Sequence, residues 1–418
     1  MKTILLAVTG MSPQVITETL WAIHRNSTVE PWPAEIHIIT TRLGALEALR
    51  GLKEDGHLTR LCGELDMPEP AFHEGLVHIV PDSAGKQIDD ARSREDHEAL
   101  ADFIMRKVAE LAQDADVRIH ASLAGGRKTM TYYFGYAMSL FGRPQDNLTH
   151  VLVSEGYEGL KDFYYPSRQQ PPITNRLGTQ LNPADAEIVL ADIPFVRLSE
   201  TLSPAMRKLA VSMTFRKLVE LLNLASQKDQ IRIMVDMPNQ SIHIGRQRGP
   251  TIVTIYLKSK TAFALFTVLV RAHMEGDHSI QRCQRDTLTG KPRPDRGLAG
   301  EIINQLAIVC GVVLPGDVNR LEDKIDILGE EYVELHEPIL NRTLVTISRH
   351  GGIVNEWLDP NLTQIRQRLQ EQLPLPLARL LEPVGMRVND AGTLVEAKGD
   401  DSAYRFHLDP EQFGIVDQ

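Results

Sequence analysis

Two glycines and two cations stand together in the run Gly125-Gly126-Arg127-Lys128, directly after an apolar stretch. Val117 to Leu123 is typical of a strand, the glycines allow a tight turn, and Thr129 lies in the first turn of a helix. The free N–H groups at a helix start carry partial positive charge, to which the arginine and the lysine add two full charges. The run predicts an anion-binding turn, although glycine turns between a strand and a helix also form for packing alone. It is not a Walker A loop, because Arg127 stands where that motif needs glycine.

A second candidate loop follows the first apolar run of the chain. Thr3 to Val8 is continuous and apolar, which is typical of a strand covered on both faces. The run ends near Gly10, and Ser12-Pro13 predicts a helix N-cap followed by proline at the first helical position. Ser12 can be a helix cap and nothing more, or it can contact a bound anion. The residues alone leave both roles open.

Strands and helices alternate through the first half of the chain, which predicts an α/β fold with a doubly wound, Rossmann-like parallel sheet. In the common doubly wound order the fourth strand lies beside the first, so the ends of these two strands flank one crevice. The loops at Gly10 and Gly125 then converge on it. The predicted strands are Thr3–Val8, Glu35–Thr40, Leu76–Val80, Arg118–Leu123 and Leu148–Val153, and the predicted helices run from Pro13 to about His24 and over Leu43–Leu52, Arg94–Gln113 and Arg127–Phe141.

The composition limits the classes of function. The 418 residues suffice for two or three domains, and the net charge of -10 argues against a protein that coats nucleic acid, so any contact to a nucleotide must be local. The 3 cysteines and 14 histidines are scattered, so we expect no bound metal, no other cofactor, no disulfide framework and a cytoplasmic location. The apolar run Ile4 to Val8 is too short for a signal peptide, and no run approaches membrane-spanning length, so no membrane contact is expected.

Several segments together resemble the CRISPR-associated ring nuclease family, whose members carry a CARF (CRISPR-associated Rossmann-fold) domain. The T-G-x-S-P-Q and G-G-R-K-T pieces, each at its expected place, carry most of the likeness, which covers about residues 1–200. It implies a CARF domain, which we expect at residues 1–168. Gln169–Leu181 is polar and contains Pro171-Pro172 and Gly178, which predicts a loop or linker, so we expect a linker and connecting segment at 169–204. The matching segments are TILLAVTGMSPQVITETLWAI from Thr3, IITT from Ile38, DSAGKQIDDARSREDHEALADFI from Asp82, SLAGGRKTMTYYFGYAMSLFG from Ser122, DNLTHVLVSEGYE from Asp146, FYYP from Phe163 and DIPFVRL from Asp192.

The resemblance implies a homodimer in which a cyclic oligoadenylate, expected to be cyclic tetra-adenylate, lies across the two-fold axis over the loops of both subunits. It also implies metal-free cleavage, in which an adenosine 2′-hydroxyl attacks the neighbouring phosphorus and leaves a 2′,3′-cyclic phosphate. Lys128 would neutralise the negative charge at phosphorus, and Ser12 would hold the scissile phosphate. The other residues assigned to the ligand are Gly10, Met11, Gln14, Thr41, Asp90, Arg92, Gly125, Gly126, Arg127 and Thr129.

The charged run Gly85 to Arg94 follows the third predicted strand, at the same edge of the sheet. It can be a lid that closes over the ligand through Lys86, Asp90 or Arg92, or a solvated loop that leads into a capped helix. Arg92 and His97 also match the spacing of a HEPN ribonuclease motif. We attribute that match to chance, because both residues lie inside the CARF-like half.

The second half, residues 205–418, resembles a winged-helix domain of the response-regulator type, an α+β fold. A helix that reads DNA normally carries several cations, whereas the candidate helix offers only Arg366 and Arg368. Other basic residues gather in Gln281–Arg296. This half can bind DNA, or it can serve for dimerisation or docking. Its predicted parts are a helix at Ser203–Leu224, β-type runs from Ile231 with turns at Pro238-Asn239 and Arg248-Gly249-Pro250, a helix at Ala262–Ala272, a reading helix at Leu362–Leu373 and a terminal wing at Met386–Val416.

The sequence thus leads to one main hypothesis and two rivals. The main hypothesis is a metal-independent ring nuclease that binds and opens cyclic tetra-adenylate in type III CRISPR antiviral signalling. The first rival is a non-catalytic sensor of cyclic oligoadenylate, whose second half regulates transcription or docks a partner. The second rival is a ligand-gated effector with an activity in residues 205–418 that has no recognisable motif.

Overall fold

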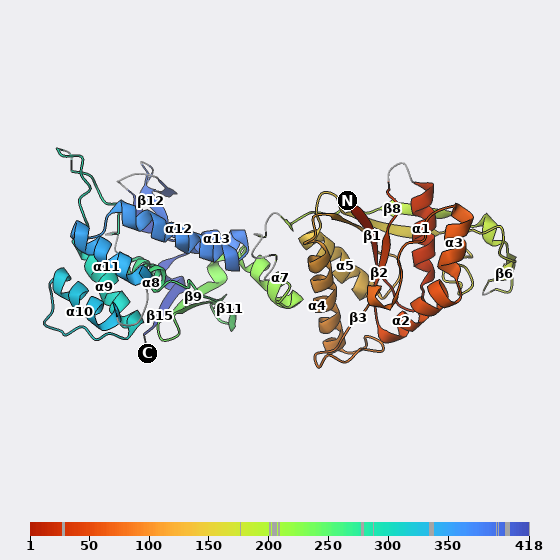
Figure 1. The fold of residues 1–418 in the computed structure, drawn as a ribbon, viewed down its shortest axis with the longest axis horizontal. Coiled ribbons are helices and arrows are strands. Elements are labelled where there is room, and N and C mark those ends of the chain that lie inside the picture. Colours follow the sequence, from red (N-terminus) through yellow and green to blue (C-terminus); the bar gives the residue numbers. More distant parts are fainter. Residues whose placement is uncertain are drawn as a thin grey trace. The chain divides into compact units, whose positions relative to one another are not determined.

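The chain divides into two compact units, Met1–Glu200 with Arg207–Arg216 and Thr201–Met206 with Lys217–Gln418 (Figure 1). This computed structural model describes all residues except 27–29, 176, 200–201, 203–206, 208–209, 277–279, 287, 334–337, 390, 392, 398–401 and 418, and it describes no side chains at 331–333 and 338–341.

A six-stranded sheet forms the centre of the first unit, in the order β3-β2-β1-β4-β5-β8. The strands from β3 to β5 are parallel, and β8 runs antiparallel to β5. β1 therefore lies between β2 and β4, which confirms the predicted doubly wound order. Leu5 and Leu6 are both fully buried, as expected of a strand covered on both faces. The strands are β1 (Lys2–Val8), β2 (Glu35–Thr40), β3 (Val77–Ile79), β4 (Val117–Ser122), β5 (Asn147–Val153) and β8 (Ile188–Asp192).

Helices cover both faces of this sheet, with α4 and α5 on one face and α1, α2 and α3 on the other (Figure 1). The core on the second of these faces includes Leu5 of β1, Ile16 of α1 and Ile36 of β2, together with Leu58 and Leu61 of α3. The alternation of strand and helix packs one apolar stripe of each helix against the sheet. The helices are α1 (Gln14–Arg25), α2 (Arg42–Ala48) with a π-helical continuation Leu49–Glu54, α3 (His57–Leu65), α4 (Arg94–Leu111) and α5 (Lys128–Phe141).

The first unit also holds elements that the sequence did not predict. Besides α3, the segment 169–204, expected to be a linker, contains β6 (Ile173–Thr174) paired with β7 (Gln180–Leu181) and the edge strand β8. β8 pairs with β5 along its whole length, from Thr149 opposite Asp192 to Val153 opposite Ile188. The linker prediction is therefore wrong for this part of the segment, because pairing with a distant strand satisfies its backbone.

Two small sheets organise the second unit. The first has the order β11-β10-β9-β15, and the second has the order β13-β12-β14. The predicted turns at Pro238-Asn239 and Arg248-Gly249-Pro250 are confirmed, because they separate β9, β10 and β11. These strands are β9 (Ile231–Asp236), β10 (Ser241–Arg246), β11 (Thr251–Ile255), β12 (Val384–Val388), β13 (Leu394–Glu396), β14 (Ala403–Arg405) and β15 (Phe413–Val416).

The chain end departs from the terminal wing expected at Met386–Val416. β15 leaves the sheet of β12 to β14 and pairs in parallel with β9, with Phe413 opposite Ile233. The predicted reading helix Leu362–Leu373 is the second part of the longer α12, and the helix predicted at Ser203–Leu224 is described as α7 only from Phe215, with residues 203–206 and 208–209 outside the described part. The helices are α7 (Phe215–Leu224), α8 (Lys260–Met274), α9 (Arg296–Cys310), α10 (Leu321–Val333), α11 (Pro338–His350), α12 (Asn355–Gln372) and α13 (Leu375–Leu381).

Among the described residues, no helix is both long enough and apolar enough to cross a membrane.

Candidate functional site

The loops after β1 and β4 lie against each other. The two strands are parallel neighbours with Ala7 opposite Ser122, so both loops leave the same edge of the sheet. A Cβ atom built on Gly10 would lie 3.6 Å from the Cα atom of Gly126. Segments more than a hundred residues apart in the sequence therefore meet at one place, as the doubly wound order requires.

The turn after β4 depends on its two glycines. Gly125 has φ 91° and Gly126 has φ 70°, a region of backbone conformation that favours glycine. A Cβ atom on Gly125 would also lie 3.2 Å from the carbonyl oxygen of Val8 and 3.1 Å from the side chain of Val15. The turn can approach β1 this closely only without side chains at this point.

Two cations follow this turn with different surroundings. Arg127 is the N-cap residue of α5 with extended backbone, and no side chain caps the helix start. Lys128 and Thr129 are the first residues of the helix, and both are exposed. Within the described part of the chain, the Lys128 ammonium group has no hydrogen-bond or ion-pair partner. A cation that is exposed and unpaired at a helix start can bind an incoming anion without first losing a partner.

The loop after β1 corrects one prediction for Ser12. The N-cap of α1 is Pro13, with φ -69° and ψ -14°, and no side chain caps this helix. The proline ring fixes φ in the helical range, so Pro13 itself occupies the N-cap position, and proline has no polar side chain to cap the helix. Met11 and Ser12, which precede this proline, are both exposed. Among the described residues, the Ser12 hydroxyl has no hydrogen-bond partner.

Gln14 is mostly enclosed. Its side chain is only 9% exposed, and its Nε2 atom donates a hydrogen bond to the Lys161 carbonyl at 2.8 Å. Its Oε1 atom is buried and has no hydrogen-bond partner among the residues that the structure describes. Gln14 therefore fastens the start of α1 to the loop after β5 and keeps one carbonyl oxygen unused, while a role toward a ligand remains a prediction.

The end of β2 brings a third loop to this edge, with Thr41 as its assigned residue. Thr41 is buried and caps α2, accepting a long hydrogen bond of 3.5 Å from the Gly44 backbone N–H. A Cβ atom on Gly44 would lie 2.6 Å from the Gly10 carbonyl oxygen and 2.1 Å from the Thr40 Oγ1 atom. The Gly10 loop thus lies against two glycines, Gly44 in the first turn of α2 on one side and Gly126 of the turn after β4 on the other.

The charged segment after β3 reaches the same edge. Asp90 accepts hydrogen bonds from Nη2 of Arg127 at 2.6 and 2.5 Å, from its Nε at 3.0 Å, and from Nε of Arg92 at 2.9 Å. Hydrogen bonds from Arg127 and then Arg92 lower the pKa of Asp90, so the carboxylate stays ionised. The structure therefore brings together these assigned residues, but as partners of one another.

Sequence reasoning missed two further residues of this group, Arg42 and Asp89. Arg42 is the first residue of α2 and forms an ion pair with Asp89 of the charged segment. Arg42 follows β2 just as Arg127 follows β4, and this equivalence was visible in the sequence once the strand order was assumed. The cations at this edge include Arg42, Arg127 and Lys128, which together with an exposed hydroxyl and backbone amides are suited to phosphate groups.

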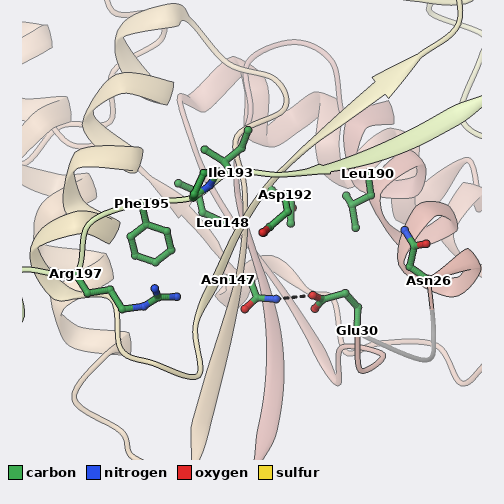
Figure 2. Close-up of a pocket in the computed structure, with 11 residues that line it drawn as sticks. Asn26, Glu30, Asn147, Leu148, Leu190, Asp192, Ile193, Phe195 and Arg197 are labelled. Carbon is green, nitrogen blue, oxygen red and sulfur yellow. Dashed lines mark hydrogen bonds between the residues drawn. The ribbon is translucent and has the colours of Figure 1, made fainter.

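A cavity of about 490 Å³ opens elsewhere in this unit (Figure 2). Asn147 at the start of β5 and Asp192 at the end of β8 line it, so it lies at the opposite edge of the sheet from the three loops. The Glu30 carboxylate accepts a hydrogen bond there from Asn147, which also lines the cavity. It accepts two more from Arg118 and His120, which are not among the lining residues. Burial works to raise the pKa of Glu30, but His120, Arg118 and Asn147 together lower it. This cavity contains no residue assigned from the sequence.

The two arginines of the candidate reading helix are paired with groups of the protein itself. Arg366 donates to the Pro383 carbonyl at 2.9 Å, and Arg368 donates to Glu371 at 2.6 Å. The positive charge of the basic run Gln281–Arg296 is also partly neutralised, because several of its arginines form ion pairs with acidic residues. These pairs are Arg282 with Asp359 at 2.6 Å, Arg293 with Asp286 at 3.1 Å and Arg296 with Glu322 at 2.7 Å.

Comparisons with known proteins address the family of the chain. No curated protein sequence matches it. A solved structure described as a type III CRISPR defence DNA nuclease activated by cyclic oligoadenylate aligns at 13% identity with a TM-score of 0.22, over 78% of this chain. The alignment spans 44% of that protein, and a similarity this low carries no argument. The model of the family described as CRISPR-associated protein NE0113 matches residues 12–227, more than half of the chain. The chain therefore belongs to this family of CRISPR-associated proteins.

Proposed function

We propose that this protein is a ring nuclease that binds a cyclic oligoadenylate, most simply cyclic tetra-adenylate, and opens it without a metal ion. The observation that carries the proposal is the meeting of the loops after β1 and β4, with Gly10 and Gly126 in contact and Lys128 exposed and unpaired beside them within the described chain. The motif resemblance suggests the class of ligand, and membership of a CRISPR-associated family fits that suggestion.

The reaction that suits these groups is an internal transesterification. The 2′-oxygen of one adenosine attacks the neighbouring phosphorus, the bond from phosphorus to the 5′-oxygen breaks, and the proton of the 2′-hydroxyl ends on the departing 5′-oxygen or in water. The product is a linear chain with a 2′,3′-cyclic phosphate. Lys128 would stabilise the charge that develops on the phosphorane oxygens, and Ser12 would orient the phosphate.

We extend the proposal to the organisation of the chain. Residues up to about 200, which include β8, would form the CARF domain, and two chains would pair so that each contributes one set of loops to a ring-shaped ligand. The second unit would act in docking or dimerisation. The paired state of Arg366 and Arg368 favours that role over DNA reading.

The decisive experiment incubates the full-length protein with labelled cyclic tetra-adenylate in EDTA and separates ring from linear products. The enzyme hypothesis expects linear product carrying a cyclic phosphate end, with the rate reduced about 10²- to 10³-fold in Lys128→Ala, as for loss of one group that stabilises transition-state charge. Lys53→Ala, a change at an exposed lysine on the π-helical turn after α2, is the matched control and should react like the wild type. A ring that binds tightly but stays intact would instead support the sensor hypothesis.

A further inference from the structure

The segment from Asp82 to Ser93 is fixed to the sheet edge by its backbone. The Ile88 N–H group donates to the Val80 carbonyl at 3.1 Å, and the Arg42 N–H group donates to the Ile88 carbonyl at 2.9 Å. Ile88 and Ala91 are buried, being 7% and 1% exposed. The segment is therefore anchored at two apolar points. Between them Asp89 is exposed and Asp90 is partly buried, with 62% and 28% of their side chains exposed.

These two acids each pair with an arginine from a different strand end. Asp89 pairs with Arg42, which follows β2, and Asp90 pairs with Arg127, which precedes α5 after β4. Asp90 also pairs with Arg92 of its own segment. β1 lies between β2 and β4, so the two ion pairs flank the end of β1 and its Gly10 loop. Two neighbouring carboxylates therefore hold arginines on both sides of the Gly10 loop, where the ligand is expected to bind.

The same arginine groups could hold phosphates. A guanidinium group binds a carboxylate and a phosphate through the same pair of parallel hydrogen bonds. The side chains of Arg42 and Arg127 are 44% and 48% exposed, so an anion from solvent can reach both. The exposed pair of Arg42 with Asp89 is weak, whereas the bidentate pair of Arg127 with the less exposed Asp90 is stronger. A ligand with several phosphates carries more charge than the two carboxylates, so it can compete for both arginines. Displacement of the acids is therefore accessible to a polyanionic ligand.

We propose that Arg42 and Arg127 are two phosphate-binding residues, and that Asp89 and Asp90 occupy their guanidinium groups until ligand phosphates displace the carboxylates. The inference rests on the proposed function for the identity of the ligand, but the exchange of one anion for another needs only phosphate. It adds Arg42 to the site, and it gives the segment after β3 the role of an internal competitor.

The test measures dissociation constants of the full-length protein for two probes, cyclic tetra-adenylate and inorganic triphosphate. The double variant Asp89→Asn/Asp90→Asn should bind both probes about 3- to 10-fold more tightly, because both competing carboxylates are lost. Arg42→Ala and Arg127→Ala should each bind them several-fold more weakly. The buried anchors Ile88 and Ala91 are unchanged in all of these variants, so the fold should be retained.

Glu95→Gln is the matched control, because Glu95 is an exposed acid in the first turn of α4 close in sequence to the segment. The gain in affinity is compared for each negative charge removed. If Glu95→Gln gains as much per charge as the double variant does, the effect comes from the overall charge of the protein, and the inference is overturned. Unchanged or weaker binding by the double variant overturns it as well. Failure of cyclic tetra-adenylate to bind, with triphosphate behaving as expected, would refute the proposed function and support the competition.

Discussion

Lys128 and Arg127 are neighbours in sequence, yet their charges have different surroundings. Arg127 is held by Asp90 through bidentate hydrogen bonds, whereas the Lys128 ammonium group is exposed and unpaired within the described residues. A cation without a partner can follow the charge that builds up on a reacting phosphate, because no existing ion pair must break first. This difference assigns charge stabilisation to Lys128 and initial phosphate binding to Arg127 in the proposed mechanism.

Ser12 and Ser93 provide a paired prediction about serines before helices. Ser93 caps α4 in a full capping box with Asp96, while Ser12 caps nothing. Ser93→Ala should lower the free energy of unfolding by about 1 kcal/mol, the usual cost of a lost cap, and Ser12→Ala should leave it nearly unchanged. Ser12→Ala should nevertheless lower the rate at which cyclic tetra-adenylate is cleaved. Urea unfolding and the cleavage assay measure the two effects, and a stability loss in Ser12→Ala equal to that in Ser93→Ala would contradict this assignment.

Glu18 of α1 predicts a pH dependence of stability. Burial, and to a lesser degree the charge of Glu158, raise the pKa of Glu18 from 4.5 to about 8. Between these pH values the unfolded chain releases a proton that the folded chain retains, so this group lowers stability as pH rises from 4.5 to 8, after which its effect is constant. Glu18→Gln should remove this loss and be more stable than the wild type at pH 9 by on the order of a few kcal/mol.

Thermal unfolding of the wild type and Glu18→Gln from pH 5 to pH 9 measures this effect. The difference in midpoint temperature should widen steadily toward pH 8. Glu54→Gln, a change at an exposed glutamate, is the control and should follow the wild type at every pH. Parallel curves for the wild type and Glu18→Gln would show that Glu18 ionises normally.

At the scale of elements, the approach of α2 to the loop after β1 rests on one glycine. Gly44 leaves no room for a Cβ atom between Thr40 and the Gly10 carbonyl, whereas Gly63 in α3 has nothing within 4 Å of that position. Gly44→Ala should therefore destabilise the protein by about 1–3 kcal/mol and weaken ligand binding by shifting the Gly10 loop. Gly63→Ala should stabilise it by roughly 0.5–1 kcal/mol, because alanine favours a helix.

Chemical denaturation of both glycine variants, followed by titration with cyclic tetra-adenylate, tests this packing. The comparison is sharp because both substitutions are the same change in a helix of the same unit. A Gly44→Ala protein as stable as Gly63→Ala would mean that the Gly10 loop adapts freely, and the preformed arrangement of the three loops would then be refuted.

At the scale of the whole molecule, the chain is two compact units, and the proposed site lies entirely in the first. One chain supplies one set of loops, and two chains related by a two-fold axis would contact equivalent halves of a ring-shaped ligand. We therefore expect one cyclic tetra-adenylate per two chains. Native mass spectrometry of the full-length Lys128→Ala protein, which should retain the ring, measures this ratio. One ring per chain would contradict the proposed dimer.

Local patterns in the sequence predicted most of the first unit. The continuous apolar run of β1, the alternation of strand and helix, and the glycine turn at Gly125-Gly126 are each set by neighbours a few residues away. The parallel order follows from general rules of chain connection, and that order alone predicts that the Gly10 and Gly125 loops meet. In the second half, the turns between β9, β10 and β11 were predicted for the same local reasons.

The amino-acid sequence by itself therefore determined the strand order and the two loops that form the proposed site. Only the tertiary structure decided that β8 joins the sheet, that β15 pairs with β9, and that Asp89 and Asp90 hold Arg42 and Arg127. The reason is physical, because the choice of a partner for an edge strand or an exposed charge depends on which distant groups the fold brings near. Such choices leave no periodic pattern in the chain.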